Sequence, residues 1–160
     1  MAEHRHLRRL ERVWVPGAVY FITVCTHGRR RLLASREATA ILRQEWAAAR
    51  ERHGWQVGRF VVMPDHVHFF CVEQAADARH ALSRFMDGWK EWTAKKICRA
   101  LSLPAPLWQP QFFDHVLRSE DSYGEKWSYV RENPVRAGLV AAWEKWPYQG
   151  FVDFDHPRGG

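Results

Sequence analysis

Two histidines, His66 and His68, stand one residue apart inside the apolar run from Phe60 to Phe70. A run this short and this apolar predicts a buried strand. Side chains alternate between the two faces of a strand, so both imidazoles point the same way, with Cα atoms about 6.5 to 7 Å apart. Two imidazoles in this arrangement can share one metal ion. Two half-buried histidines that only form hydrogen bonds fit the spacing as well, and the pair alone favours that simpler interpretation.

A second candidate group lies in the C-terminal stretch SYVRENPVRAGLV. Tyr129 and Asn133 are four residues apart on an expected helix and would be neighbours on one of its faces. A phenol can act as a nucleophile, and an amide oxygen is a hard metal ligand. The alternative is a packed tyrosine and an asparagine that ends the helix before Pro134. The spacing alone favours this alternative too.

The elements that would carry these groups alternate along the chain. Runs of β-branched and aromatic residues predict strands, and periodic apolar positions between cap residues predict helices. We expect strands at 19–27, 55–64, 66–72 and 111–119, and helices at 35–53, 77–101 and 119–133. Ser35 is the expected N-cap of the first helix, and Gly54 is its expected stop.

The step between the two central apolar runs decides the fold class. Pro64 and Asp65 mark either a turn between two strands or a bend within one, and there is no room for a crossover helix. A parallel α/β fold is therefore disfavoured. We expect an α+β fold with helices packed against a mainly antiparallel sheet. The helix expected at 77–101 has an apolar face for this packing, made by Leu82, Phe85, Met86, Trp89, Thr93 and Ile97.

Length and charge narrow the function classes. With 160 residues the chain fits one domain, 1–160, in which residues 1 to about 16 form a basic arm. A net charge of +6 and a pI near 9.6 favour a polyanionic partner, either nucleic acid or an anionic membrane. A solvated basic surface is the simpler explanation, so charge alone decides little.

Cysteine usage and hydropathy indicate the compartment. Cys25, Cys71 and Cys98 are odd in number and widely spaced, which argues against a disulfide framework and against a cysteine zinc site. The first residues lack the apolar core of a secretory signal, and no apolar stretch is long enough to cross a bilayer. We expect a soluble cytoplasmic protein with no membrane partner.

Taken together, four segments resemble the single-tyrosine HUH transposases, and among them the REP-associated tyrosine transposases. The segments are VVMPDHVHFF (61–70), WKEWTAKKI (89–97), LWQPQFFDHVLRSED (107–121) and YVRENPVRAGLV (129–140). They occur in the same order as in that family and, with their flanks, span about residues 19–148. Each segment alone is unspecific, whereas the ordered set is specific.

The resemblance implies a ferredoxin-like sheet with the histidine pair on a central strand, and an enzyme that cleaves and joins single-stranded DNA at hairpin-forming, REP-like sequences. It implies that Tyr129 is the nucleophile, that His66 and His68 are metal ligands, and that Asn133 is a third, helix-borne ligand. The metal would be Mg²⁺ or Mn²⁺, which sequence cannot distinguish. One departure is Asp65, where the family more often has asparagine; we expect its carboxylate to serve the turn rather than the metal.

Several other residues compete for roles or add to them. Tyr20 lies in an expected strand, Tyr148 follows the last motif, and Tyr123 has a tryptophan four residues later, so Tyr129 is the preferred nucleophile. His115 would lie near the site only if its strand neighbours the histidine strand, and a structural role is the simpler expectation. The basic residues expected along a DNA backbone are Arg29, Arg30, Arg31, Lys95 and Lys96, together with Arg5, Arg8 and Arg9 of the arm.

Three other functions stay open. A hairpin-DNA-binding regulatory protein without catalysis would share the basic surface. A nickase of replication or conjugation would share the chemistry, although the chain has no helicase-like region. A metallohydrolase that uses water would leave Tyr129 unexplained. The chain would act as a monomer or a homodimer, with the tyrosine serving its own metal site or that of its partner.

Overall fold

The structure is a computed structural model that describes residues 18–74 and 81–157. Its strands are β1 (Val19–Cys25), β2 (Trp55–Val62), β3 (His66–Glu73), β4 (Phe113–Leu117) and β5 (Gln149–Phe151). They form one antiparallel sheet in the order β4-β1-β3-β2-β5. With helices after β1 and β3, the first four strands have the ferredoxin-like arrangement. The α+β prediction is confirmed, whereas the basic arm and residues 77–80 of the second expected helix lie outside the described residues.

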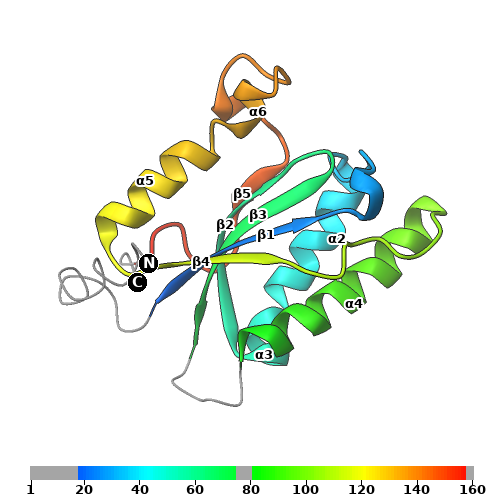
Figure 1. The fold of residues 1–160 in the computed structure, drawn as a ribbon, viewed down its shortest axis with the longest axis horizontal. Helices are drawn as coiled ribbons and strands as arrows, with labels where there is room; N and C mark the ends of the chain where they lie inside the picture. Colours follow the sequence, from blue (N-terminus) through cyan, green and yellow to red (C-terminus); the bar gives the residue numbers. More distant parts are fainter. Residues whose placement is uncertain (1–17, 75–80, 158–160) are drawn as a thin grey trace.

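The helices cover both faces of this sheet (Figure 1). They are α2 (Arg36–Ala47), α3 (Ala49–His53), α4 (Leu82–Leu101), α5 (Glu120–Val130) and α6 (Asn133–Arg136), with single 3₁₀ turns η2 (His27–Arg29) and η4 (Trp143–Lys145). In the part of the chain that the structure describes, none of them is both long enough and apolar enough to span a membrane. The helices α2, α3 and α4 lie on one side of the sheet, and α5 lies on the other.

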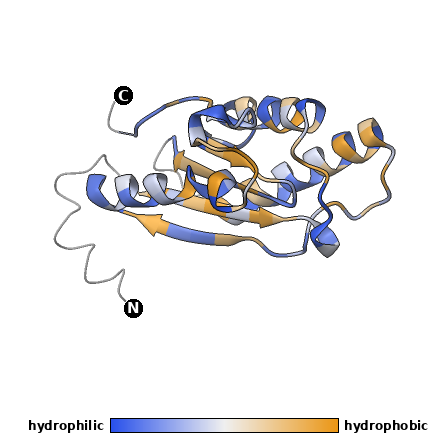
Figure 2. Ribbon diagram, turned by 90° about the horizontal axis from the view of Figure 1, so that it is seen from above, coloured by the Kyte–Doolittle hydropathy of each residue, from blue (hydrophilic) through white to orange (hydrophobic). Residues whose placement is uncertain are grey.

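The alternation of side chains along the strands gives the sheet two apolar faces. Ile22, Val24 and Phe69 point to one face and are buried against Trp46 of α2 and Trp89 of α4. Figure 2 shows hydrophilic and hydrophobic residues mixed along the helices. This mixture is expected of helices that bury only one side against a sheet. The predicted apolar face of α4 is confirmed, since its buried residues are Phe85, Met86, Trp89, Thr93 and Ile97.

The opposite face of the sheet forms a smaller core beneath α5. Phe21 of β1 and Phe70 of β3 pack there against Tyr123 and Val130 of α5. His66 and His68 alternate with Val67, which points to the larger core, so both imidazoles lie on the α5 side. The sheet therefore separates the histidine pair from α2, α3 and α4.

The turn at Pro64 and Asp65 joins two strands rather than bending one. Met63 N–H donates to the His66 carbonyl at 2.8 Å, and β2 then pairs antiparallel with β3. Because β3 lies between β1 and β2, the histidines are on a central strand. His68 stands opposite Thr23 of β1 on one side and opposite Val61 of β2 on the other.

Two predicted helices differ from what the structure shows. The helix expected at 35–53 begins and ends as predicted: Ser35 Oγ accepts from Ala38 N–H at 3.1 Å, and Gly54 has φ 75°. It is nevertheless two helices, because the backbone at Ala48 (φ −83°, ψ −7°) leaves the helical path.

The helix expected at 119–133 is also shorter than predicted. It ends at Val130, and Asn133 begins the separate helix α6. The prediction that Tyr129 and Asn133 share one helix face is therefore wrong. Pro134 explains the break, because it has no N–H to continue the ladder and restricts the residue before it, yet it is well suited to the first turn of a new helix.

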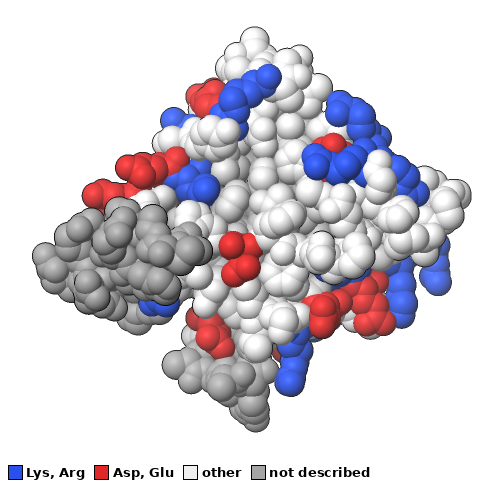
Figure 3. All heavy atoms as spheres, in the orientation of Figure 1, with Lys and Arg blue, Asp and Glu red and all other residues white. Residues whose placement is uncertain are grey.

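Charge is unevenly spread over the face seen in Figure 3. Basic side chains gather near α6 and around the segment that follows β1, and a mostly uncharged surface lies between these two groups. Acidic side chains lie along α5. A polyanion on this face would therefore meet positive charge on both sides of the surface above β3.

Candidate active site

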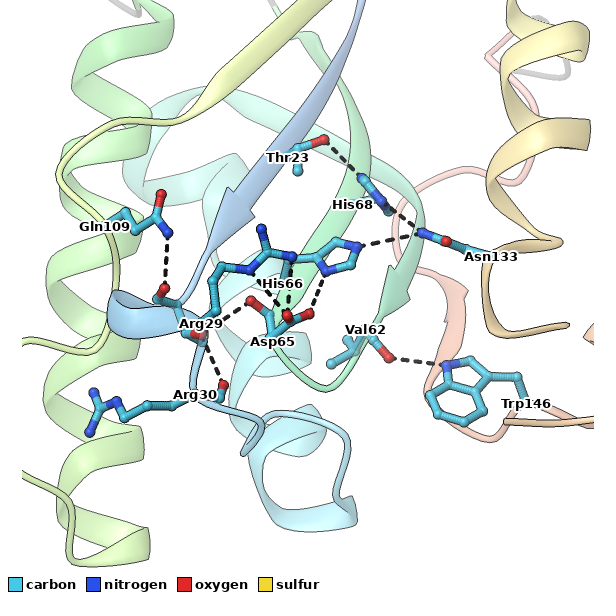
Figure 4. Close-up of polar contacts among 11 residues, drawn as sticks. Thr23, Arg29, Arg30, Val62, Asp65, His66, His68, Gln109, Asn133 and Trp146 are labelled. Carbon is cyan, nitrogen blue, oxygen red and sulfur yellow. Dashed lines mark hydrogen bonds and ion pairs between the residues drawn. The ribbon is translucent and has the colours of Figure 1, made fainter. Parts of the chain in front are cut away.

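The two imidazoles of β3 lie against each other with both Nδ1 atoms bonded to the protein (Figure 4). Their ring centroids are 4.7 Å apart at an interplanar angle of 78°. His66 Nδ1 lies 2.8 Å from Asp65 Oδ1, and His68 Nδ1 lies 2.8 Å from Thr23 Oγ1. An ionised carboxylate only accepts hydrogen bonds, so His66 donates from Nδ1 and its Nε2 keeps a free lone pair.

Asn133 lies where the two Nε2 atoms converge. Its Nδ2 is 3.0 Å from His68 Nε2 and 3.5 Å from His66 Nε2. An amide N–H₂ group that donates to both rings requires both Nε2 atoms to be acceptors, so His68 also donates from Nδ1, to Thr23. A half-turn of the amide would present Oδ1 to the same point. Two imidazole nitrogens and one amide oxygen then face a common centre.

The electrostatics favour neutral imidazoles at this point. Burial, followed by the charges of His66, Lys126 and Arg136, lowers the pKa of His68 to about 3. Burial also lowers the pKa of His66, although the neighbouring Asp65 opposes that shift. Both shifts favour the neutral imidazole, the form in which histidine binds metals.

Asp65 contributes to both the turn and the site. Its carbonyl accepts from Thr26 N–H at 3.0 Å, and its Oδ2 pairs with Arg29 at 3.1 Å. Burial alone would raise the pKa of Asp65, but the hydrogen bonds from His66 and Arg29 bring that pKa below its ordinary value. The expectation that Asp65 serves only the turn is therefore incomplete, because its carboxylate also contacts a candidate ligand.

This donor set fits a divalent cation. No three His, Cys, Asp or Glu side chains of the described residues gather as a metal site, so a third protein ligand beside the two histidines would be of another type. Asn133 is placed to supply it. Imidazole nitrogen and amide oxygen together suit Mn²⁺ by softness, and Mg²⁺ accepts the oxygen with water completing its shell.

Tyr129 lies beside these groups at the end of α5. Its side chain is 64% exposed, and its ring is covered on one face by the Arg136 guanidinium, with Cζ 3.8 Å from the ring centroid. A cleft of about 260 Å³ is lined by Phe21, His68, Lys126, Tyr129, Val130, Asn133 and Arg136. An exposed phenol and a candidate metal-binding group thus open into the same space, supplied by one chain.

Comparison with known proteins identifies the family to which this arrangement belongs. Residues 15–132 match the family described as IS200-like transposases. The chain belongs to the IS200-like transposase family. The match includes both histidines and Tyr129 and ends one residue before Asn133. The resemblance found in the sequence is therefore confirmed at the level of the family.

Individual proteins with similar sequences or structures support this assignment. A REP-associated tyrosine transposase of Escherichia coli K12 is 27% identical over 151 residues, which cover 94% of this chain and 83% of the relative. The solved structure of a REP-associated tyrosine transposase bound to a REP hairpin has a TM-score of 0.69 at 25% identity, covering 85% of this chain and 78% of that one. A crystal structure from Deinococcus radiodurans, with a TM-score of 0.53 at 20% identity over 74% of this chain and 92% of that one, shares the fold.

The other tyrosines of this transposase-family chain are placed for structural roles. Tyr123 is 2% exposed and donates its hydroxyl hydrogen to the Asp155 carbonyl at 3.1 Å, and its pKa is strongly raised by burial. Tyr20 packs edge-on against Trp55, and burial raises its pKa. Tyr148 packs edge-on against Trp146. Neither Tyr123 nor Tyr20 lines the cleft.

The expected DNA-binding residues divide into two groups. Arg29, Arg30 and Arg31 follow β1 beside the histidine pair, where Arg29 binds Asp65 and Arg30 donates to the Pro106 carbonyl at 2.6 Å. Lys95 and Lys96 lie on α4, on the other side of the sheet from the histidines. The structure does not bring these two lysines to the site.

Lys95 and Lys96 also have acidic partners. Lys95 pairs with Glu91 at 3.1 Å, and Lys96 pairs with the buried Glu45 at 2.6 Å. His115 is likewise away from the histidine strand, because β4 pairs with β1, where His115 stands opposite Phe21.

Two basic cleft residues are absent from the sequence-based expectation. Lys126 precedes Tyr129 by three positions on α5, and Arg136 follows Asn133 by three positions. Helical spacing places residues three apart on one face, so the helix carrying a candidate nucleophile contained the signal for Lys126. Arg136 had no such signal, because its position depends on the break before α6.

Proposed function

We propose that this chain cleaves and rejoins single-stranded DNA beside a hairpin, through a 5′-phosphotyrosine formed on Tyr129. The observation that carries the proposal is the shared cleft, in which the exposed Tyr129 ring, His68 and Asn133 line one space. Membership of the IS200-like transposase family supports the reaction class. The arrangement within one chain supports a tyrosine that serves its own metal site, so a monomer would suffice.

His66, His68 and Asn133 would hold a divalent cation, Mg²⁺ or Mn²⁺. Such a cation would supply charge neutralisation to a phosphodiester that otherwise repels nucleophiles. Asp65 and Thr23 would keep the two Nε2 atoms unprotonated and aimed at the ion, since each accepts the Nδ1 hydrogen of its histidine. The metal-binding role and the catalytic role are both part of this proposal.

Tyr129 would attack the scissile phosphorus through its phenolic oxygen. The bond from the tyrosine oxygen to phosphorus forms while the bond from phosphorus to the 3′ oxygen breaks. The phenol proton is lost, and the departing 3′ oxygen gains a proton to become a 3′-hydroxyl. Because the phosphodiester energy is kept in the tyrosine ester, another 3′-hydroxyl can reverse the step and join two strands.

Hairpin DNA is the proposed substrate because a solved structural relative is bound to a REP hairpin. The groups near α6 and after β1 in Figure 3 would contact the backbone on either side of the cleft. A single-stranded flank is required because the scissile phosphate must reach Tyr129 between α5 and the sheet.

End-labelling tests the proposal. A hairpin oligonucleotide with a single-stranded flank is labelled at either end, incubated with protein and Mg²⁺ or Mn²⁺, and run on a denaturing gel. We expect the 3′-labelled DNA to move into a protein band and the 5′-labelled product to run as a free shorter strand. A free 5′-phosphate without adduct would instead indicate a metallohydrolase that uses water. Binding without cleavage would indicate a regulatory hairpin-binding protein.

A further inference from the structure

Two basic side chains face the cleft from the helices that carry Tyr129 and Asn133. Lys126 lies on α5 and Arg136 on α6, and both line the space that Tyr129 and His68 share. The Lys126 ammonium lies 5.1 Å from the Phe21 ring centroid, and the Arg136 guanidinium lies 3.8 Å from that of Tyr129. Each cation thus lies over an aromatic ring that lines the cleft, Lys126 over Phe21 of β1 and Arg136 over Tyr129 of α5.

Their partners differ from those of three other cations of the described residues. Arg29, Arg52 and Lys96 each form an ion pair with a carboxylate at 3.1 Å or less. Within the described ranges, neither Lys126 nor Arg136 forms an ion pair with a carboxylate. Two positive charges that line one cleft, neither of them paired with a carboxylate, repel each other and any cation held at the histidine pair. An anion in the cleft would remove that repulsion.

From this geometry we infer that Lys126 and Arg136 form a phosphate-binding site that receives the DNA phosphodiester next to Tyr129 and binds it without metal. The inference rests on the proposed function for its substrate, single-stranded DNA. A planar guanidinium can hold two phosphate oxygens at once, and an ammonium adds a point charge from the other wall. The site would seat the phosphate between α5 and β3, within reach of the tyrosine oxygen.

The position of Arg136 also affects the orientation of Tyr129. Because its guanidinium lies on the Tyr129 ring, one side chain contacts both the nucleophile and the proposed phosphate position. Arg136 would thereby hold the ring where its oxygen meets the phosphorus. Lys126 has no contact of this kind with Tyr129, so its contribution would be to binding alone.

Binding measured without metal tests the inference separately from catalysis. A labelled hairpin oligonucleotide with a single-stranded flank is titrated in EDTA at several salt concentrations, and log K is plotted against log salt. Each cation removed should make the slope less negative by about 0.7, the value for one phosphate contact to a single strand. We expect this for Lys126→Met, which keeps the packing over Phe21, and for Arg136→Gln. Arg136→Lys should restore the slope because it keeps the charge.

Arg99→Gln is the matched control. Arg99 is exposed in the last turn of α4, on the other side of the sheet, and its removal should leave the slope unchanged. Unchanged slopes for Lys126→Met or for Arg136→Gln would overturn the inference, as would an equal change for Arg99→Gln. If the slopes of the variants become less negative as expected but wild type forms no adduct, the phosphate site stands and the proposed catalysis fails. If wild type forms the adduct but the slopes of the variants equal that of wild type, the proposed catalysis stands and the phosphate site fails.

Discussion

At the scale of single residues, the site depends on how each histidine is held. His66 and His68 both use Nδ1 for a hydrogen bond to the protein, to Asp65 and Thr23, at 2.8 Å. Their Nε2 atoms are left to face Asn133. A ligand whose tautomer and orientation are fixed before binding loses less entropy when the ion arrives. In the proposed metal site, Asp65 and Thr23 behind the histidines would therefore matter almost as much as the histidines themselves.

Asp65 gives the first prediction. Asp65→Ala removes the acceptor of the His66 Nδ1 hydrogen and should lower metal affinity by about 10- to 100-fold. Asp65→Asn keeps an acceptor oxygen, so its metal affinity should fall much less than that of Asp65→Ala. Calorimetric titration with Mn²⁺ measures both affinities, and circular dichroism checks that each variant is folded. Equal affinity of Asp65→Ala and wild type would show that Asp65 serves only the turn.

His68 predicts how stability depends on pH in the absence of metal. An unfolded histidine gains a proton near pH 6.5, whereas in the fold the pKa of His68 lies at about 3. Between these values the unfolded state holds more protons, so the free energy of unfolding falls as pH is lowered from 6.5 towards 3. One such group contributes a slope of up to about 1.4 kcal/mol per pH unit.

His68→Gln removes this titrating group and keeps a polar side chain beside Thr23. The pKa of His66 is also lowered, and the pKa of Asp65 lies below its ordinary value of 3.8. Both shifts also make the free energy of unfolding fall as pH is lowered, and both remain in the variant. Urea unfolding in EDTA between pH 5 and 7 should therefore show a shallower pH dependence for the variant. Parallel curves for variant and wild type would contradict the burial of a neutral His68.

At the scale of elements, α5 decides where the proposed nucleophile, Tyr129, lies. Ser119 begins this helix in a capping box: its Oγ accepts from Ser122 N–H at 2.9 Å, and Ser122 Oγ accepts from Ser119 N–H at 3.3 Å. The buried Tyr123 and Val130 then fix the helix to Phe70 and its neighbours. Tyr129 is thus held over the sheet by contacts on either side of it along the helix.

Loss of the cap should be visible in stability. Ser119→Ala is expected to lower the free energy of unfolding by about 1 kcal/mol, within a range of about 0.5 to 2 kcal/mol. For a domain of this size that lowers the thermal midpoint by about 2 to 4 °C. Ser128→Ala, at an exposed position of the same helix, is the control and should cause no loss. Equal midpoints for Ser119→Ala and wild type would refute the capping role.

Element boundaries were predictable where the signal is local. Ser35 and Gly54 mark the ends of the first helical region because an N-cap and a left-handed C-cap depend only on neighbouring residues. The break at Ala48 was not predictable, since alanine favours helix and no glycine or proline lies nearby. Pro134 did signal a boundary, but whether it ends one helix or begins another depends on the chain around it.

At the scale of the whole molecule, the site joins segments that are distant in sequence. Thr23 and His68 are 45 residues apart, and Asn133 and His66 are 67 apart. Residue types and spacing raised His66, His68, Tyr129 and Asn133 as candidates, and the family resemblance supplied their association. Which side of the sheet each helix covers could not be read from sequence. Lys95 and Lys96 were therefore grouped with the site, although α4 lies on the other side of the sheet, and Lys126 of α5 was not.

The central claim of the proposed function is that Tyr129 attacks DNA from the cleft it shares with His68 and Asn133. Tyr129→Phe keeps the ring beneath Arg136 and removes only the oxygen, so hairpin binding should survive within about twofold, which corresponds to about 0.4 kcal/mol. Tyr123→Phe is the matched control, because its hydroxyl is buried against Asp155.

Peptide mapping of the covalent adduct on labelled hairpin DNA, with Mg²⁺ or Mn²⁺ present, is therefore the most direct measurement. Wild type and Tyr123→Phe should both form the adduct, and the modified peptide should contain Tyr129. Tyr129→Phe should bind the hairpin and form none. An adduct that persists in Tyr129→Phe, or one that maps to another residue, would contradict the account.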